Sequence, residues 1–325
     1  LRGEALLSAL ERPLRCVVTG CAGFIGSHLA ETLVERGHQV VGIDCFTDYY
    51  PRATKLANLS SLLESPRFTM VEADLLEHDL RSLLEGADCV FHQAAQAGVR
   101  ASWGRNFSIY TENNVLATQR LLEAAREVPL QRFVYASSSS VYGDARQLPV
   151  SEDALPQPIS PYGVTKLAAE HLCRLYWVNF GVPAVSLRYF TVYGPRQRPD
   201  MGFHRFIRAL LADDEIVVYG DGDQTRDFTY VSDAVAANLS CMEADVVGRV
   251  FNVGGGSRIS VNRVLSVLES ISGRMARVRR IENQKGDVRH TYADTSRARD
   301  ALGFAPAIPL EEGLRRQFEW QVNRR

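Results

Sequence analysis

The sequence predicts an α/β protein with a doubly wound parallel sheet and a smaller mixed α/β lobe at the C-terminal side. Short apolar strands alternate with helical patterns through the first 190 residues, as in parallel sheets covered by helices on both faces. A glycine-rich turn joins the first strand to the first helix, and no internal repeat or low-complexity linker divides the chain. With 325 residues, the chain is long enough for one large α/β unit and an appended lobe.

The glycine-rich turn defines the first βαβ unit. The β-rich segment 15–19 ends in Gly20-x-x-Gly23-x-x-Gly26, a helical pattern follows over 27–36, and the next strand, 40–43, ends at Asp44. Such glycines allow a tight turn and let the backbone approach a pyrophosphate at the helix N-terminus. Asp44 follows Gly26 by 18 residues and suits the adenosine ribose hydroxyls, but it would repel a 2′-phosphate. The unit predicts a Rossmann-type sheet that binds NAD in preference to NADP.

Further βα units extend this sheet. Because the carboxyl ends of parallel strands meet at one edge, we expect the glycine loop, Ala94–Ala95, the serine run Ser137–Ser140 and Tyr162 to share one cleft. The predicted strands are 68–72, 87–92, 133–136 and 184–188, and the predicted helices are 113–127 and 162–180. The cofactor and the reacting side chains would then lie side by side.

The chain divides by its sequence character into two parts. We assign residues 1–190 to an NAD-binding domain and residues 191–325 mainly to a substrate-binding lobe. The lobe starts with the polar, proline-bounded loop 195–200, and segment 227–256 is expected to return to the large sheet. Within the lobe, the pattern predicts a helix over 202–212 and a strand over 216–219.

The most informative pair of residues is Tyr162 and Lys166. A phenol has a pKa near 10 and needs nearby positive charge to act as a base at neutral pH. A lysine four residues on shares its helix face, and a serine upstream can share the proton that is moved. Only three of the 37 basic residues are lysines, so this one stands out. An isolated pair of this kind is more often an ordinary surface pair; the preceding glycine loop reverses that expectation.

Composition excludes several classes of function. The net charge of −1 gives no reason to expect nucleic acid or an anionic membrane as a partner. No apolar run reaches the length of a membrane span, and residues 1–15 look like a short amphipathic extension, not a signal peptide. The six cysteines are scattered, without CxxC pairs or histidine clusters at ligand spacing. These features favour reduced thiols, a cytoplasmic location and no metal.

With these motifs in place, the chain resembles the nucleotide-sugar epimerases of the extended short-chain dehydrogenase/reductase superfamily, from about residue 14 to 320. The matching segments, in order, are Thr19–Gly26, His92–Ala95, Asn114-Val115, Ser137–Gly143, the Tyr162/Lys166 pair, Arg188-Tyr189-Phe190, Gly220-Asp221-Gly222, Arg226-Asp227-Phe228 and Asn252-Val253-Gly254. Within this family the chain is most similar to the UDP-glucuronate 4-epimerases. The segments typical of that group are Tyr49-Tyr50-Pro51, Ala94–Arg100, Arg188–Met201 and Gly286-Asp287-Val288.

The resemblance implies roles for particular residues. Tyr162 would be the base and Lys166 its partner, and the serine that shares the proton would be Ser138 or Ser139. The implied NAD-binding residues are Gly20, Gly23, Phe24, Ile25, Gly26, Asp44, Asp74, Leu75, Ala94, Ala95, Asn114, Tyr162, Lys166 and Tyr189. The implied substrate-binding residues are Arg100, Ser139, Ser140, Thr191, Arg198 and Arg226. For Arg226, an ion pair with Asp223 or Asp227 is the alternative interpretation.

The implied activity is NAD-dependent 4-epimerisation of UDP-glucuronate to UDP-galacturonate through a transient 4-keto sugar. UDP-glucuronate decarboxylases carry Glu at the position of Ser140, and UDP-galactose 4-epimerases commonly carry Asn at that of Thr191, so both alternatives are less favoured. Arg198 suits a hexuronate carboxylate. A catalytically silent NAD-sensing scaffold is the alternative outside enzymes, but such proteins usually lose the Tyr or the Lys. The resemblance also implies a homodimer that packs through helices 113–127 and 162–180.

Overall fold

The computed structural model describes residues 12–145, 147–282 and 284–324, so most of the expected N-terminal extension lies outside the described residues. The strands are β1 Arg15–Thr19, β2 Gln39–Asp44, β3 Phe68–Glu72, β4 Cys89–His92, β5 Arg132–Ser138, β6 Ala184–Tyr189, β7 Thr191–Tyr193, β8 Glu215–Tyr219, β9 Thr225–Tyr230, β10 Val250–Val253, β11 Arg258–Ser260 and β12 Arg277–Ile281. The α-helices are α1 Phe24–Glu35, α2 Arg52–Asn58, α3 Ser60–Leu63, α4 Leu80–Leu84, α5 Phe107–Tyr110, α6 Ala117–Ala125, α7 Pro161–Phe180, α8 Gly202–Ala212, α9 Val231–Glu243, α10 Val261–Ser272, α11 Ser296–Leu302 and α12 Leu310–Val322.

A parallel sheet of seven strands forms the centre of the molecule, in the order β10-β6-β5-β4-β1-β2-β3. Strand β1 pairs with β2 on one side and with β4 on the other, so that Val17 lies opposite both Val41 and Val90. The chain therefore reverses its direction of winding between β1 and β4, and loops that leave these two strands diverge. Ligands bind in the crevice that such a divergence opens.

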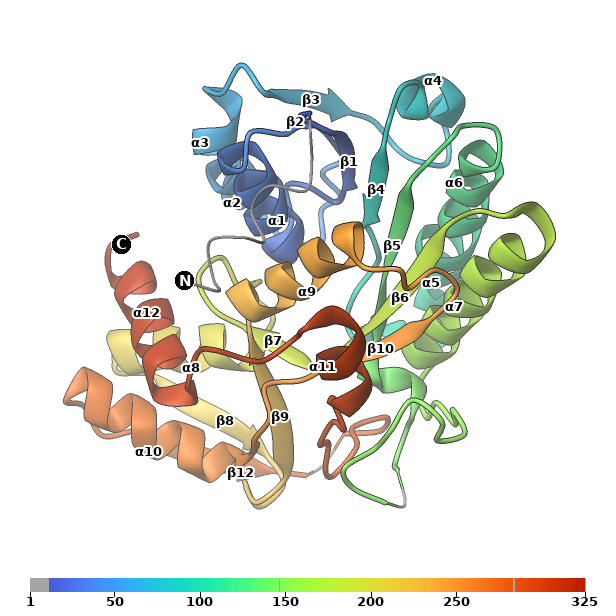
Figure 1. The fold of residues 1–325 in the computed structure, drawn as a ribbon. Helices are drawn as coiled ribbons and strands as arrows, with labels where there is room; N and C mark the ends of the chain where they lie inside the picture. The colour runs from blue at the N-terminus through green and yellow to red at the C-terminus, as the bar shows by residue number, and fades with distance from the viewer. Residues whose placement is uncertain (1–11, 146, 283, 325) are drawn as a thin grey trace, which may run out of the picture.

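Helices cover both faces of this sheet (Figure 1). Helices α1 and α9 pack against one face, and α4, α6 and α7 pack against the other. Apart from the edge strand β3, the strands are mostly buried and rich in Val, Leu and Phe, as expected for a parallel sheet enclosed on both sides. The predicted Rossmann-type, doubly wound α/β fold is confirmed.

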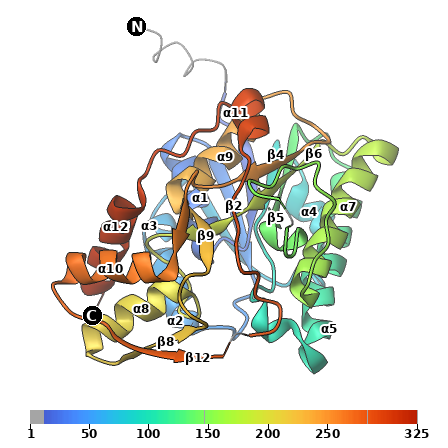
Figure 2. The ribbon, with the colours of Figure 1, turned by 90° about the horizontal axis from the view of Figure 1, so that it is seen from below.

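The C-terminal elements build a smaller lobe beside the sheet. Strands β8 and β12 form a two-stranded parallel sheet, and α8, α10 and α12 gather around it (Figure 2). A three-stranded sheet in the order β11-β9-β7 connects the two parts of the molecule. Its strand β7 directly follows β6 of the large sheet, and its strand β9 directly follows β8 of the lobe. The division into domains 1–190 and 191–325 stays a prediction.

Segment 227–256 takes three different positions. Strand β9 belongs to the three-stranded sheet, α9 covers the large sheet over β5 and β6, and β10 pairs with β6 as the edge strand of the large sheet. The expected return to the large sheet thus involves the helix and the last strand, whereas β9 stays in the smaller sheet.

Several element boundaries differ from the sequence prediction. The first helix begins at Phe24, directly after the glycine loop, not at Ser27. Strand β4 begins at Cys89, because Asp88 turns to accept a hydrogen bond from the backbone N–H of Arg15. The helix predicted over 113–127 instead runs from α5 through a wide π-helical turn, Thr111–Leu116, into α6, which ends at Ala125.

Candidate active site

The glycine loop after β1 forms one wall of a deep cleft. Gly20 has a φ of +67°, and a methyl group there would come within 2.8 Å of the backbone of Ala94. A methyl group at Gly26 would come within 2.1 Å of the carbonyl oxygen of Gly20. Gly23 precedes α1 and supplies no capping side chain, so the first N–H groups of the helix remain available to an anion. The loop fits the pyrophosphate of a dinucleotide.

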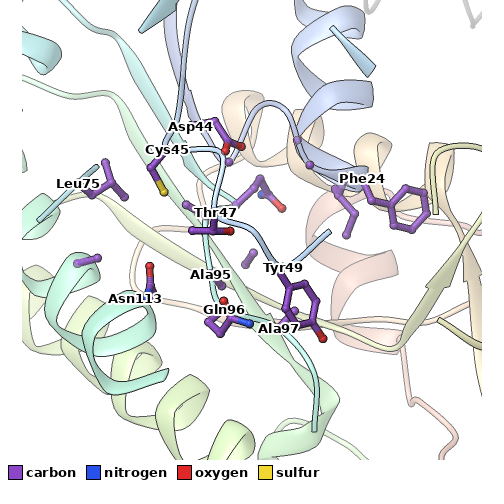
Figure 3. A pocket seen from close by; sticks show the side chains of 18 of the residues that line it. Phe24, Asp44, Cys45, Thr47, Tyr49, Leu75, Ala95, Gln96, Ala97 and Asn113 are labelled. Carbon is purple, nitrogen blue, oxygen red and sulfur yellow. The ribbon is translucent and has the colours of Figure 1, made fainter. Parts of the chain in front are cut away.

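The far end of the cleft fits an adenosine. Asp44 ends β2, and its carboxylate accepts hydrogen bonds from the backbone N–H groups of Ala22 at 3.2 Å and Phe46 at 2.8 Å. These bonds fix the carboxylate at the end of the cleft, and its contact with a ribose stays a prediction. Figure 3 shows Asp44, Cys45, Thr47 and Leu75 around this part of the cleft.

Lys55 is a residue of this region that the sequence analysis missed. Its side chain is only 6% exposed, and its ammonium lies 3.9 Å from Asp44 and donates hydrogen bonds to both the carbonyl and the hydroxyl of Thr47. The Lys55 ammonium thus places a positive charge beside the Asp44 carboxylate, and its bonds to Thr47 hold loop 45–49 against α2. The rarity of lysine in the sequence is a signal that could have identified Lys55, but only Lys166 was singled out by it.

Nearly all the expected cofactor residues line this cleft. They are Gly20, Gly23, Phe24, Ile25, Gly26, Asp44, Asp74, Leu75, Ala94, Ala95, Tyr162, Lys166 and Tyr189. Other lining residues, which the sequence analysis did not assign to the cofactor, include Ile43, Cys45, Thr47, Tyr49, Tyr50, Lys55, Gln93, Gln96, Ala97, Asn113 and Ala117.

Asn114 lies behind the wall of the cleft, not on it. It is 1% exposed, and its amide bonds to the backbone N–H and carbonyl of Gln96 and to the hydroxyl of Thr165. It therefore ties the loop after β4 to α7. Its neighbour Asn113 faces the cleft (Figure 3). In the π-helical turn, sequence alone does not tell which of two adjacent asparagines faces inward.

Tyr162 and Lys166 stand at the start of α7. Ser160 caps the helix through a hydrogen bond from the N–H of Gly163 to its hydroxyl, and Pro161 occupies the first turn, where it needs no N–H partner. Ser138, the last residue of β5, lies near Tyr162. Burial raises the pKa of Tyr162, while the Ser138 hydroxyl and the charge of Arg198 act in the opposite direction.

Lys166, four residues after Tyr162 on α7, is buried. Its ammonium donates a hydrogen bond of 2.7 Å to the carbonyl of Ala136, and burial lowers its pKa to about 7. Ser139 and Ser140 follow in a half-buried 3₁₀ turn, Ser139–Val141, and the N–H of Ser140 donates to the hydroxyl of Ser138. Of the serines, Ser138 is the one whose hydroxyl lowers the pKa of Tyr162, whereas neither Ser139 nor Ser140 lines this cleft or the second cavity beside it.

A buried ionic network supports this arrangement from behind. Glu170, one turn after Lys166, accepts hydrogen bonds from Ser137 at 2.6 Å and from Arg188 at 2.6 and 3.0 Å. Arg188 also donates to Tyr142, whose hydroxyl donates to Asn252 on β10. The network joins α7 to β5, β6 and β10, so the serine run and the start of the substrate lobe are held together. Every charge in it is paired, as burial requires.

A second cavity lies beside the cleft and is rich in arginine. Arg100, Arg226 and Arg289 line it, together with Thr191 and Tyr219. Arg100 stacks 3.8 Å above the Tyr219 ring and pairs with Asp287 at 2.7 Å. Cationic walls of this kind suit an anionic ligand such as a diphosphate.

Among the described residues, no carboxylate forms an ion pair with Arg226. It donates to the backbone carbonyls of Thr225 and Arg289, and burial lowers its pKa. Asp227, a partner in the alternative interpretation, instead accepts from the N–H groups of Gly255 and Ala293, so that ion pair does not form.

The two cavities meet at Tyr49, which lines both, and at Arg198, which faces the first while Asp200 faces the second. Arg198 pairs with Asp200 at 3.0 Å. Arg196 points elsewhere and pairs with Glu31 of α1 at 2.8 Å, so it is a structural residue here. The described residues contain no cluster of His, Cys, Asp or Glu that could hold a metal. Among them, no helix has the length and apolar character needed to span a membrane.

Residues 16–254 match the family described as the NAD dependent epimerase/dehydratase family. The UDP-glucuronic acid 4-epimerase of Bacillus cereus, solved in complex with UDP-glucuronic acid and NAD, has a TM-score of 0.94 and 45% identity, covering 96% of this chain and 100% of that one. A Bacillus subtilis protein named as an uncharacterized UDP-glucose epimerase is 48% identical over 94% of this chain and 98% of its own length. The UDP-glucuronate 4-epimerase of Thermodesulfobacterium geofontis is 37% identical over 94% and 95%, respectively.

Proposed function

Because the chain belongs to the NAD dependent epimerase/dehydratase family, we propose that it catalyses the NAD-dependent 4-epimerisation of UDP-glucuronate to UDP-galacturonate. One observation carries this proposal: Tyr162 and Lys166 line the same cleft as the glycine loop. A base, its cationic partner and a dinucleotide site therefore share one cavity. The protein is an isomerase, and NAD is its cofactor.

The chemistry divides between the cofactor and the chain. NAD, held by the glycine loop and Asp44, would supply the acceptor and donor for the hydride of the sugar C4. The Tyr162 phenolate takes the proton from O4, so that C4 becomes a carbonyl, and gives the proton back as the hydride returns. Ser138 shares this proton, and the positive charge of Lys166 favours the phenolate. Because the oxidation is reversed in every turnover, the protein needs no added oxidant.

The nucleotide part of the substrate fits the second cavity. Arg100 and Arg226 supply positive charge for the diphosphate of UDP, and Thr191 lines the same cavity near its junction with the cleft. The sugar then extends past Tyr49 toward Tyr162. Substitution of Arg226 by Ala should raise the Kd of UDP itself; an unchanged Kd would remove Arg226 from this site.

The substrate carboxylate requires restraint. The 4-keto uronate is a β-keto acid, which loses CO2 when its carboxylate stands perpendicular to the carbonyl plane. Thr191 and Arg198, which line the two cavities, are the groups we propose to hold the carboxylate out of that alignment while the ring turns over; Ser139 and Ser140, which the resemblance also implied, line neither cavity. Release of a UDP-pentose by the Arg198→Ala variant would support this role, whereas weaker binding without pentose would exclude it for Arg198.

The test of the proposed function is incubation of the purified protein with UDP-glucuronate and no added cofactor, followed by NMR of the anomeric signals. Formation of UDP-galacturonate without loss of carbon is the expected result. Formation of UDP-xylose or a UDP-4-keto-pentose would make the protein a decarboxylase. Unchanged substrate, despite bound NAD, would favour an NAD-binding scaffold.

We propose that the protein acts as a homodimer. Leu116, Val164, Leu175 and Val178 are large apolar side chains that are each 47–62% exposed on neighbouring helical segments. Such a stripe is suited to a four-helix interface between two copies. Light scattering of the purified protein measures its mass directly, and a monomer at micromolar concentration would refute the dimer.

We also propose a cytoplasmic location. Every cysteine, from Cys16 to Cys241, lies in the described part of the chain and is free. Free, mostly buried thiols are typical of proteins from a reducing compartment. Immunodetection in fractionated cells would test this, and recovery with the secreted fraction would contradict it.

A further inference from the structure

An acidic residue lies where the substrate carboxylate is expected. Asp200 holds Arg198 through two hydrogen bonds of 3.0 Å, one from Nε to Oδ1 and one from Nη2 to Oδ2. The hydroxyl of Tyr49 donates to the same Oδ2 at 3.2 Å. Because Tyr49 lines both cavities, this pair stands at the junction that a UDP-sugar has to cross between its diphosphate and its C4.

The pair uses only part of the guanidinium. Within the described residues, Nη1 of Arg198 makes no hydrogen bond, whereas the edge formed by Nε and Nη2 is occupied by Asp200. Arginine has five N–H donors in a planar fork, so a second carboxylate can approach the free end without breaking the first pair. The Arg198 side chain is 21% exposed, so its charge is only partly solvated.

Arg198 does not depend on Asp200 for the position of its loop. The carbonyl of Pro195 is hydrogen-bonded to the ring of His28 on α1 at 2.9 Å, and Arg196 pairs with Glu31 on the same helix. The side chain of Gln197 is buried and bonds to Gln317 of α12. The backbone is thus anchored on both sides, and the main contribution of Asp200 is its negative charge.

We propose that Asp200 is the resident counter-ion of Arg198, and that it sets how strongly the site prefers a hexuronate over a neutral hexose. The inference rests on the proposed function, which it deepens by adding neutral UDP-hexoses as a second substrate class. Asp200 is a specificity-determining residue in this account, and Arg198 remains the group that contacts the sugar.

The physical basis is the charge that remains when the sugar is bound. A neutral hexose covers Arg198 and reduces its solvation without supplying a negative charge, which is unfavourable for an unpaired cation. Asp200 compensates that cation, so the site tolerates the neutral sugar. A hexuronate instead brings a second carboxylate close to Asp200. The repulsion between the two carboxylates reduces the preference of the site for the hexuronate over the neutral hexose.

Removal of the Asp200 charge should therefore act in opposite directions on the two substrates. The test is the Asp200→Asn variant, loaded with NAD, and calorimetric Kd values for UDP-glucuronate and UDP-glucose. We expect the ratio Kd(UDP-glucose)/Kd(UDP-glucuronate) to rise by about tenfold relative to the wild type, with UDP-glucose bound more weakly. The kcat/KM ratio for the two sugars should change in the same sense.

Two variants serve as controls. Asp200→Glu keeps the negative charge and should keep the ratio close to that of the wild type. Glu31→Gln removes the partner of Arg196 on the same loop and should change both Kd values together. Thermal unfolding of each variant verifies that it is folded.

Two outcomes would overturn the inference. An unchanged ratio in Asp200→Asn would mean that Asp200 does not influence substrate choice. A lower ratio, through loss of UDP-glucuronate binding, would make Asp200 a positioning residue for Arg198 instead. Both differ from failure of the proposed function, in which the wild type binds the sugar nucleotides without converting UDP-glucuronate.

Discussion

The buried ammonium of Lys166 donates a 2.7 Å hydrogen bond to the carbonyl oxygen of Ala136 and is not neutralised by the carboxylate one turn further on. That carboxylate, Glu170, accepts hydrogen bonds from Ser137 and Arg188 instead. The helix therefore leaves Lys166 without a carboxylate partner on the wall of the cleft that Tyr162 also lines. Burial lowers the pKa of Lys166 to about 7, a consequence that can be tested through stability and through activity.

The Lys166→Met variant should be more stable than the wild type, and more so at low pH. In the unfolded chain lysine keeps its proton up to about pH 10.4, whereas folded Lys166 loses it near pH 7. The unfolded state binds more protons between these values, so wild-type stability due to this group rises with pH across that window. Below pH 7 the full unfavourable effect of burying the charge is present. Methionine removes it.

Thermal unfolding between pH 6.5 and 9 measures this effect. We expect Lys166→Met to raise the Tm by roughly 5 °C at pH 6.5 and by clearly less at pH 9. The same variant should lose turnover, because the phenolate loses its cationic neighbour. A Tm difference that is independent of pH would show that Lys166 is not titrating in the folded protein near neutrality.

The Tyr162→Phe variant should bind UDP-sugars but not convert them. Removal of a general acid–base group typically lowers kcat by about 10²–10⁴-fold, and the ring that packs against Tyr110 is retained. We expect the Kd for UDP-glucuronate to change by less than about threefold. The matched control is Tyr50→Phe, which removes a hydroxyl from another part of the same cleft and should leave kcat near the wild-type value. Equal turnover in Tyr162→Phe and wild type would refute the assignment of Tyr162 as the base.

The Asp44→Asn variant should retain less NAD. Both carboxylate oxygens of Asp44 accept backbone N–H groups, and an amide would turn its NH2 toward one of those donors. The ribose hydroxyls would also lose a charged acceptor. We expect a Kd for NAD at least about tenfold higher, read from the NAD content of the purified protein. Asp79→Asn, at an exposed helix cap, is the control that should keep full NAD content.

The cofactor half of the site was largely predictable from the sequence because its residues lie in continuous motifs. The glycine loop, Asp44 and the Tyr162/Lys166 pair each combine a local backbone pattern with a chemical requirement. The parallel order of the strands then brings them to one edge of the sheet. Periodicity also identified α8 over 202–212 and β3 over 68–72 with correct boundaries.

The residues that were missed depend on contacts between distant segments. Lys55 reaches Asp44 only because α2 packs back over loop 45–49, and the position of Asp200 depends on Tyr49, which lies 151 residues away in the sequence. The inward direction of Asn113 depends on a π-helical turn, which has no reliable pattern in the sequence. Local propensity carries no information about these three relationships.

The proposed dimer leads to a last prediction. A charge introduced into the exposed apolar stripe of the helices should separate the two copies. Leu175 is 52% exposed on α7, and Val164 and Val178 lie on the same face of the helix because they stand 11 residues before it and 3 residues after it. Leu175→Glu would place a carboxylate in the interface of each subunit, where burial without a partner is strongly unfavourable. Light scattering should then give the mass of one chain, with NAD content unchanged. Met275→Glu, at an 81% exposed apolar residue away from these helices, should stay dimeric. If both variants keep the dimer mass, the interface lies elsewhere.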